Sequence, residues 1–243
     1  MAIRRGHKVS IKANVNTTRV DSIYLDLKED ETRRIRFMPP NRQDGALFTK
    51  IVNHFRLKTD DNPPRGMAVA CNGHFKDEEC YLCQLSKVLK KDGDKAEKKI
   101  GDDIRASARF YAPVLVAEKE DDGTWTYHGP KLLGLPKTAV EDVNAILLQQ
   151  DMAGDDFFCD ADKGQDVLIT RTGTGFNTKY KASATGQKNK LDTIFPEWEE
   201  KFIETVESEV GLNFLTIEDQ KSAAVRTFGD DLDWDALAED FNL

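Results

Sequence analysis

Hydrophobic and polar residues alternate along several short segments in the first three-quarters of the chain. This two-residue period is typical of β-strands that bury one face. The predicted strands are Ser22–Leu27, Arg33–Met38, Leu47–Leu57, Arg109–Glu118, Thr124–Tyr127, Val167–Arg171 and Lys179–Ala182. Asp121-Asp122-Gly123 and the segment 172–176 predict hairpin turns. Because proline has no amide proton for a ladder bond, Pro113 favours a sheet edge or a bulge.

A second period, with apolar residues three and four positions apart, predicts helices. It is clearest in Thr138–Gln150, and shorter helices are predicted at Gln84–Lys91 and Ile217–Thr227. Helical spacing also relates Trp198, Phe202, Ile203 and Val206. The chain is therefore expected to be mainly β with peripheral helices. Five or so short strands with one helix between strands favour an OB-type fold, a five-stranded Greek-key barrel, followed by a C-terminal helical segment.

Charge divides the chain into regions. The net charge of the 243 residues is −8, yet residues 193–243 hold 3 Lys/Arg against 14 Asp/Glu, so the preceding residues are mildly basic. Residues 1–20 contain basic side chains and no acid, which predicts a flexible basic arm. Residues 230–243 hold six acids and no base, which predicts a disordered acidic tail. A folded body is expected over 21–229. The alternative for residues 1–20 is a solvated leader without a role, and the alternative for residues 230–243 is a tail that only improves solubility.

Apolar content argues against export and membrane insertion. No apolar run approaches the ~20 residues of a membrane helix, and the first residues lack the apolar core of a secretory signal. Four cysteines, three of them clustered, fit a reducing compartment better than disulfides. We therefore expect a cytoplasmic protein, in which the isolated Cys159 is a buried thiol.

The three clustered cysteines predict one structural zinc ion. Cys71 is followed by the pair Cys80 and Cys83, whose C-x-x-C spacing lets one turn hold two thiolate ligands. A fourth ligand is available from His74 inside the window or from His54 upstream, and spacing alone favours His74. Such a closed site pins a polar, turn-rich segment that apolar burial could not hold.

The sequence carries no arrangement of residues that predicts catalysis. A zinc deaminase needs H-x-E and P-C-x-x-C, whereas His74 is followed by Phe75 and Lys76, and Cys80 is preceded by Glu79. The H-E-x-x-H and phosphate-loop motifs are also missing. We therefore expect a protein that is not an enzyme.

Basic and aromatic residues are interleaved in the predicted strands. Phosphates attract Lys and Arg, and unpaired bases stack on aromatic rings, so such a surface suits single-stranded nucleic acid of any sequence. Filling of a barrel core is the alternative role for each aromatic residue. The candidate nucleic-acid contacts are Arg34, Arg36, Arg105, Arg109, Phe110, Tyr111, Tyr127, Lys131, Arg171, Phe176, Lys179 and Tyr180.

The order of these motifs resembles the single-stranded DNA-binding proteins of T-even bacteriophages. The resemblance is carried by Ile35-Arg36-Phe37-Met38-Pro39, Ile51-Val52-Asn53-His54, the cysteine window, the segment 110–116 and the acidic end. It covers most of residues 20–230 and is most specific around the cysteines. It implies an OB-fold with an inserted zinc subdomain at about residues 50–92, in a phage protein acting in the bacterial host.

The resemblance also assigns residues. It names His54, rather than His74, as the partner of the cysteine ligands, so His74 becomes the reserve ligand. As DNA contacts it implies Arg36, Arg105, Phe110, Tyr111, Tyr127 and Phe176. It implies self-association along DNA through the arm, whose candidate residues are Arg4, Arg5 and Lys8. It further implies a tail that recruits replication and recombination proteins, with candidate residues Asp231, Asp233, Trp234, Asp235 and Phe241.

These expectations lead to one functional hypothesis and two rivals. The first is a sequence-nonspecific, cooperative single-stranded DNA-binding protein of DNA replication, recombination and repair. A single-stranded RNA-binding OB protein is the rival of the same class. A zinc-stabilised adaptor, which binds proteins through its arm and tail, is the rival of a different class.

Overall fold

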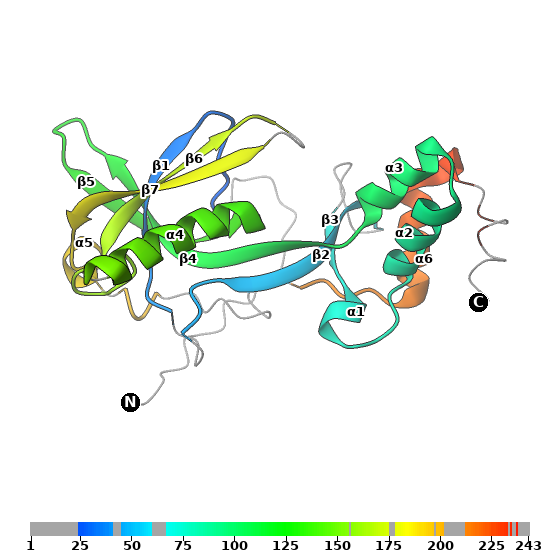
Figure 1. Cartoon of the computed structure of the whole chain (residues 1–243), viewed down its shortest axis with the longest axis horizontal. Helices are drawn as coiled ribbons and strands as arrows, with labels where there is room; N and C mark the ends of the chain where they lie inside the picture. Colours follow the sequence, from blue (N-terminus) through cyan, green and yellow to red (C-terminus); the bar gives the residue numbers. More distant parts are fainter. Residues whose placement is uncertain are drawn as a thin grey trace. The chain divides into compact units, whose positions relative to one another are not determined.

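The computed structural model describes residues 24–40, 45–59, 67–155, 157–174, 178–196, 198–201 and 212–232, together with residues 234 and 237. The chain divides into two compact units (Figure 1). Unit 1 comprises Met1–Lys50 with Phe110–Gly211, and unit 2 comprises Ile51–Arg109 with Leu212–Leu243. Each unit is therefore built from segments that are far apart in the sequence.

Unit 1 contains an antiparallel sheet. Its strands are β1 (Thr32–Phe37), β4 (Ser107–Lys119), β5 (Trp125–Leu135), β6 (Gln165–Thr172) and β7 (Lys179–Lys188). β1 lies between β4 and β6, with Ile35 opposite both Val116 and Val167, while β5 pairs with β4 and β7 with β6. Helix α4 (Lys137–Ala153) connects β5 to β6, and the short helix α5 (Leu191–Ile194) follows β7.

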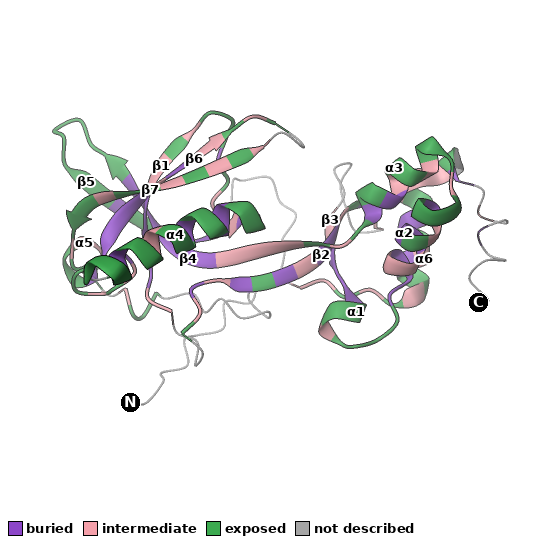
Figure 2. Ribbon diagram, in the orientation of Figure 1, coloured by how far each residue is buried: buried purple, intermediate pink, exposed green. Residues whose placement is uncertain are grey.

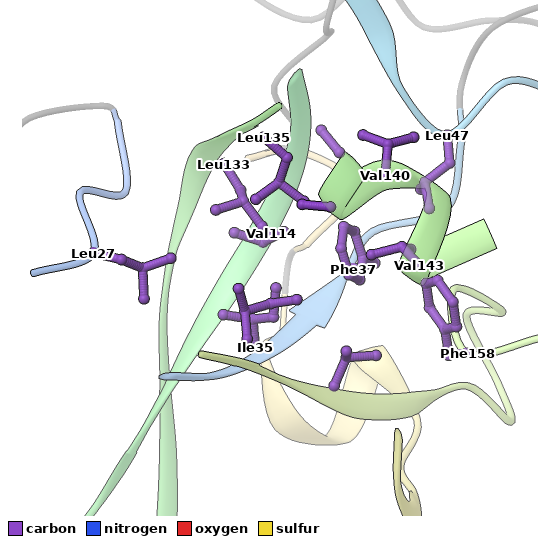
Figure 3. Close-up of a cluster of buried hydrophobic side chains, with 14 residues drawn as sticks. Leu27, Ile35, Phe37, Leu47, Val114, Leu133, Leu135, Val140, Val143 and Phe158 are labelled. Atoms are coloured by element: carbon purple, nitrogen blue, oxygen red, sulfur yellow. The ribbon is translucent and has the colours of Figure 1, made fainter. Parts of the chain in front are cut away.

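The main core of unit 1 lies between the sheet and α4. Alternation along β1 points Ile35 and Phe37 to one face, where they belong to the same buried cluster as Val140 and Val143 of α4 (Figure 3). Phe158 packs beside Phe37, with ring centroids 5.1 Å apart. A smaller, separate cluster contains Met38, Leu115, Ala117, Tyr127 and Leu191.

Unit 2 combines a hairpin with helices. Strands β2 (Thr49–Leu57) and β3 (Met67–Ala70) pair antiparallel and lead into α1 (Asn72–Phe75), α2 (Tyr81–Asp92) and α3 (Lys95–Ile104). From the C-terminal segment come α6 (Ile217–Phe228) and the 3-10 turn η2 (Gly229–Asp231). Apolar residues of α2, α3 and α6 share one core, which includes Leu82, Leu85, Leu89, Ile104, Ala223 and Ala224. Figure 2 shows buried and exposed residues interspersed along these helices, as expected for helices with one apolar face.

The expectation of a mainly antiparallel, β-rich chain with several helices is confirmed. Most predicted elements are present. β5 and β7 are longer than predicted. The prediction ended too early because Gly129-Pro130-Lys131 interrupts the alternation in β5, and because residues 183–188 of β7 are small or polar. The sequence patterns do not predict β3, α1, α3 and α5. A signal for α3 is its capping box, in which Asp94 accepts from the amide of Glu97 and the Glu97 side chain accepts from the amide of Asp94.

Two strand expectations have specific outcomes. In the predicted strand 22–27, the described residues pair only at Tyr24, through an isolated bridge to Leu132. Pro113 does not lie in an edge strand, because β4 pairs on both sides. The register of β4 with β5 shifts between Val114 and Val116, just beyond the proline. Pro113 therefore lies next to a bulge-like irregularity.

The remaining expectations concern Cys159, the N-terminal arm, the segment after Trp198 and membrane helices. Cys159 is half-buried beside the main core rather than fully buried. The basic arm at 1–20 and most of the predicted helical segment after Trp198 lie outside the described residues. Where the chain is described, no helix has the length and apolar character needed to cross a membrane.

Candidate metal centre and nucleic-acid interface

Four potential metal ligands meet inside unit 2. The ligand atoms of His54, Cys71, Cys80 and Cys83 all lie within 4.8 Å of one another. His54, Cys71 and Cys80 are buried and Cys83 is half-buried. The cluster could hold one metal ion. It contains the histidine indicated by the family resemblance.

Local structure places each ligand. His54 lies in β2 just before the register shift against β3, and Cys71 directly follows β3. Cys80 is the residue preceding α2, and Cys83 lies in the first turn of that helix. A backbone hydrogen bond from Cys83 reaches the thiol of Cys80, as is usual in a two-residue knuckle. One hairpin and one helix N-terminus therefore converge on a single point.

The distances between ligand atoms suit a tetrahedral ion. The Sγ atoms of Cys71 and Cys83 lie 3.5 Å apart, and His54 Nε2 lies 3.3 Å from Cys80 Sγ and 3.7 Å from Cys83 Sγ. Bonds of ~2.3 Å to sulfur and ~2.0 Å to nitrogen would set tetrahedral ligands about 3.5–3.8 Å apart. The observed spacings are close to these values.

A backbone carbonyl orients the imidazole. His54 Nδ1 lies 2.6 Å from the carbonyl oxygen of Ile104, at the end of α3. When Nδ1–H donates to this oxygen, the lone pair of Nε2 is left for the metal. A histidine that ligates a metal usually has its second nitrogen held in this way.

Proton affinities within the cluster are strongly perturbed. Burial would lower the pKa of His54, but hydrogen bonds to Cys71, Cys80 and the Ile104 carbonyl outweigh it and raise the pKa to about 9. Hydrogen bonds from Cys71 and Cys83 lower the pKa of Cys80, whereas hydrogen bonds with Cys71 and Cys80 raise the pKa of Cys83. Three neighbouring thiols cannot all ionise without a counter-charge, and a metal cation supplies that charge.

Gln220 links the C-terminal helix to the cluster. Its side chain is fully buried, with Oε1 3.5 Å from Cys80 Sγ and 3.4 Å from the amide of Leu82. Its Nε2 donates to the carbonyl of Leu215. Sequence reasoning did not find this residue, because it lies 140 positions from Cys80 and belongs to no motif.

His74, the reserve ligand, is not part of the cluster. It is exposed on α1, and its ring packs edge-on against Phe75 with centroids 4.9 Å apart. Its spacing from Cys71 is compatible with ligation, but its ring is engaged at the surface rather than among the buried thiols. This geometry favours His54 over His74.

Arg36, expected at the DNA surface, is fully buried in unit 1. Its guanidinium donates to the carbonyls of Phe158 at 2.5 Å, Asp160, and Asn189 at 3.3 Å. A side chain at Gly164 would collide with that guanidinium, so this glycine makes room for it. Burial lowers the pKa of Arg36. The arginine therefore joins the loop before β6 to the sheet rather than facing solvent.

Arg34 and Tyr127 meet at a buried carboxylate. Asp166 accepts from Arg34 Nε at 2.5 Å and from the Tyr127 hydroxyl at 2.6 Å. Burial, followed by this hydrogen bond, raises the pKa of Tyr127 to about 12. Arg34 also covers the exposed ring of Trp125, 4.3 Å from its centroid. These two expected DNA contacts are thus engaged within the protein.

Tyr111 has a different environment, half-buried on β4. Its ring lies against Gly134, where any side chain would come within 2.7 Å of it. The ring of Tyr24 lies 6.1 Å away in an edge-to-face arrangement. Sequence reasoning did not include Tyr24, since it lies near the start of the β-rich region, far from the other candidates. The two tyrosines form a partly accessible aromatic pair.

The remaining expected contacts are distributed over both units. Phe110 and Tyr180 are half-buried and pack against the main core of unit 1. Lys131 is half-buried, Lys179 is exposed, and Arg171 donates to the carbonyl of Leu27. In unit 2, Arg105 is exposed and Arg109 is half-buried. Phe176 lies outside the described residues.

Part of the acidic end contributes to the helical core of unit 2. Leu232 and Leu237 are buried in its helical core, and Trp234 packs beside them and donates to the carbonyl of Gly229 at 2.7 Å. This packing differs from the expectation of a disordered tail for these three residues. Asp231 is exposed, whereas Asp233, Asp235 and Phe241 lie outside the described residues.

Comparison with known families finds a match that covers most of the chain. Residues 29–227 match the family described as gp32 DNA binding protein like. The match includes all four potential metal ligands. The chain therefore belongs to this family, as its sequence motifs predicted. A search of curated proteins finds no match.

Proposed function

We propose that the chain is a sequence-nonspecific single-stranded DNA-binding protein without catalytic activity. The observation that carries this proposal is the family match over residues 29–227. The strand arrangement of unit 1 also supports this proposal, because it is the arrangement expected of an OB-fold. In the unit 1 sheet three strands precede α4 and two follow it, and the first strand pairs with the second and the fourth. OB-folds commonly bind single strands along such a sheet.

The accessible candidates are the preferred DNA contacts. Tyr111, Phe110 and Tyr180 would offer rings to unpaired bases, and Tyr24 would support Tyr111 from the side. Phosphates would be met by Arg105, Arg109, Lys131 and Lys179. Arg34, Arg36 and Tyr127 are assigned to the interior of unit 1 instead, because each of them already donates hydrogen bonds to acceptors there.

The metal is proposed to be one structural zinc ion. Three cysteines and one histidine form a donor set that zinc prefers, and the four protein ligands complete a tetrahedron. Zinc bound there would join the β2–β3 hairpin to α2 in a zinc subdomain. Since Gln220 contacts Cys80, the same ion would help to hold α6.

Further roles follow from the family and the charge distribution. We propose action in phage DNA replication, recombination and repair within the host cytoplasm. Cooperative binding would use the arm with Arg4, Arg5 and Lys8. The acidic end would recruit replication and recombination proteins through the acids of residues 230–243 and Phe241. Trp234 would have to leave its packed position to serve as a partner anchor.

Equilibrium titration with labelled oligonucleotides tests the main proposal. Fluorescence anisotropy should report tight binding to an oligo-dT strand, weaker binding to a duplex of equal length, and an affinity that falls steeply with salt. Equal affinity for duplex and single strand would contradict the proposal. Preference for an RNA strand would favour the RNA-binding rival, and no binding to any of the three would favour the adaptor.

Replacing Tyr111 with alanine should weaken oligo-dT binding by ~1–3 kcal/mol, because one base loses its stacking surface. The slope of log affinity against log salt should stay unchanged, since no cation is removed. Tyr111→Phe is the matched control and should bind almost normally. A change in slope without loss of affinity would show that Tyr111 is not a stacking platform.

Neutralising acids of the C-terminal segment should speed DNA association at low salt. The acids would otherwise occupy the basic surface intermittently, an attraction screened beyond a Debye length of ~10 Å at 0.1 M salt. The variant Asp231→Asn/Asp233→Asn/Asp235→Asn retains the apolar residues Leu232 and Leu237, which pack on unit 2. Stopped-flow fluorescence should show the difference at low salt and its disappearance at high salt. Identical rates at low salt would remove this role.

A further inference from the structure

A basic cavity opens on unit 2 beside the metal cluster. Its volume is about 550 Å³, within the usual range for sites that hold small ligands. The walls come from α2 and from the residues that follow α3: Cys83, Ser86, Lys87, Lys90, Lys91, Arg105 and Ala106. Four of these seven residues are cationic, and none is acidic.

Helix packing fixes the shape of this cavity. The Ser86 hydroxyl donates to the carbonyl of Gly101 at 2.7 Å, so α2 and α3 are held in close contact. Any side chain at Gly101 would approach Lys90 Cγ to 2.9 Å. The lining residues of α2 recur at helical spacing from Cys83 to Lys91, so they share one side of that helix. Arg105 reaches the cavity from the end of α3.

Two of the four cationic residues that line the cavity are not neutralised by an ion pair within the described part of the chain. Lys90 forms an ion pair of 2.7 Å with Asp102, and Lys91 forms a longer one of 3.5 Å with Asp92. Lys87 and Arg105 form no ion pair with any residue that the structure describes, although Arg105 contributes to the field at Asp102. Like charges spaced three and four residues apart destabilise a helix, so an anion bound between them would relieve repulsion.

We propose that this cavity binds an internucleotide phosphate of single-stranded DNA, an inference that rests on the proposed function. The planar guanidinium of Arg105 can donate two parallel hydrogen bonds to one phosphate, and Lys87 adds a point charge. The cavity is larger than a phosphate alone. Lysine stems and Ala106 give it apolar walls that suit the adjoining sugar.

The cavity shares a wall with the metal cluster. Cys83 lines the cavity and is one of the four potential ligands, so a bound ion would hold the first turn of α2 in place. DNA binding at the cavity should therefore depend on the metal. Chelation of the metal should therefore reduce the protection of Lys87 by bound DNA.

The salt dependence of binding provides the first test. Lys87→Gln should lower oligo-dT affinity about tenfold at low salt and reduce the salt slope by ~0.7, the value for one phosphate contact on a single strand. Lys98→Gln is the matched control, because Lys98 is an exposed lysine of α3 that does not line the cavity. An unchanged slope in Lys87→Gln, with wild-type protein that binds, would overturn the cavity proposal alone.

Lysine protection locates the contact directly. Acetylation of the full chain, followed by mass spectrometry, should be slower at Lys87 when (dT)8 is bound and unchanged at Lys98. Unchanged acetylation of Lys87 at saturating (dT)8 would overturn the proposal while leaving single-strand binding intact. Protection by a decaglutamate peptide but not by (dT)8 would also overturn it, in favour of an acidic peptide. Failure of wild-type protein to bind (dT)8 in anisotropy would reject the proposed function itself.

Discussion

Cys83→Ser and His54→Ala should each lose the bound metal and strongly destabilise unit 2. Structural zinc contributes ~10–16 kcal/mol of binding free energy to folding in small zinc domains. We expect unit 2 to depend on such an ion, because the segment that links its hairpin to α2 is polar and turn-rich. Unit 1 has its own core, built around Phe37, Val140 and Phe158, and should remain folded.

Metal content, measured by mass spectrometry alongside circular dichroism, checks this expectation. Wild-type protein should hold one zinc ion per chain, and the two variants should hold none. Oligo-dT affinity should fall, since the cavity beside Cys83 would lose its shape. His74→Ala is the matched control and should keep its zinc, because His74 is exposed and outside the cluster. Retention of zinc in His54→Ala together with its loss in His74→Ala would reverse the ligand assignment.

Replacement of Arg36 with alanine should destabilise unit 1 by about 3 kcal/mol or more. The substitution removes the guanidinium hydrogen bonds to the carbonyls of Phe158, Asp160 and Asn189, and hydrogen bonds to a charged group contribute ~1.5–3 kcal/mol each. It also opens a void beside Gly164, where the guanidinium fits closely. Against a typical total stability of ~5–15 kcal/mol, the loss is large.

Urea denaturation of Arg36→Ala measures this loss, with Arg33→Ala as control. Arg33 is a neighbour on the same strand, but it is half-exposed and pairs with Glu31 and Glu118 near the surface. Its removal should therefore change stability by less than ~1 kcal/mol. A fully stable Arg36→Ala variant with a reduced salt slope for DNA would instead return Arg36 to the phosphate contacts expected from sequence.

Local patterns were sufficient to predict several parts of the molecule. Alternation identified β1 and β4, and helical spacing identified α4, because one buried face imposes its period on the sequence. The C-x-x-C knuckle predicted a metal site, since its two cysteines are brought together by a single turn. Motif order identified the family. None of these inferences required knowledge of which distant segments meet.

Contacts between distant segments were decided by the tertiary structure. Spacing alone favoured His74, whereas the pairing of β2 with β3 and the position of α2 bring His54 against Cys80. Alternation could not show that Arg36 is buried, because loop residues cover its side chain and supply carbonyl partners. Gln220 and Leu237 join unit 2 from the other end of the chain, and their contacts depend on packing that no local period records.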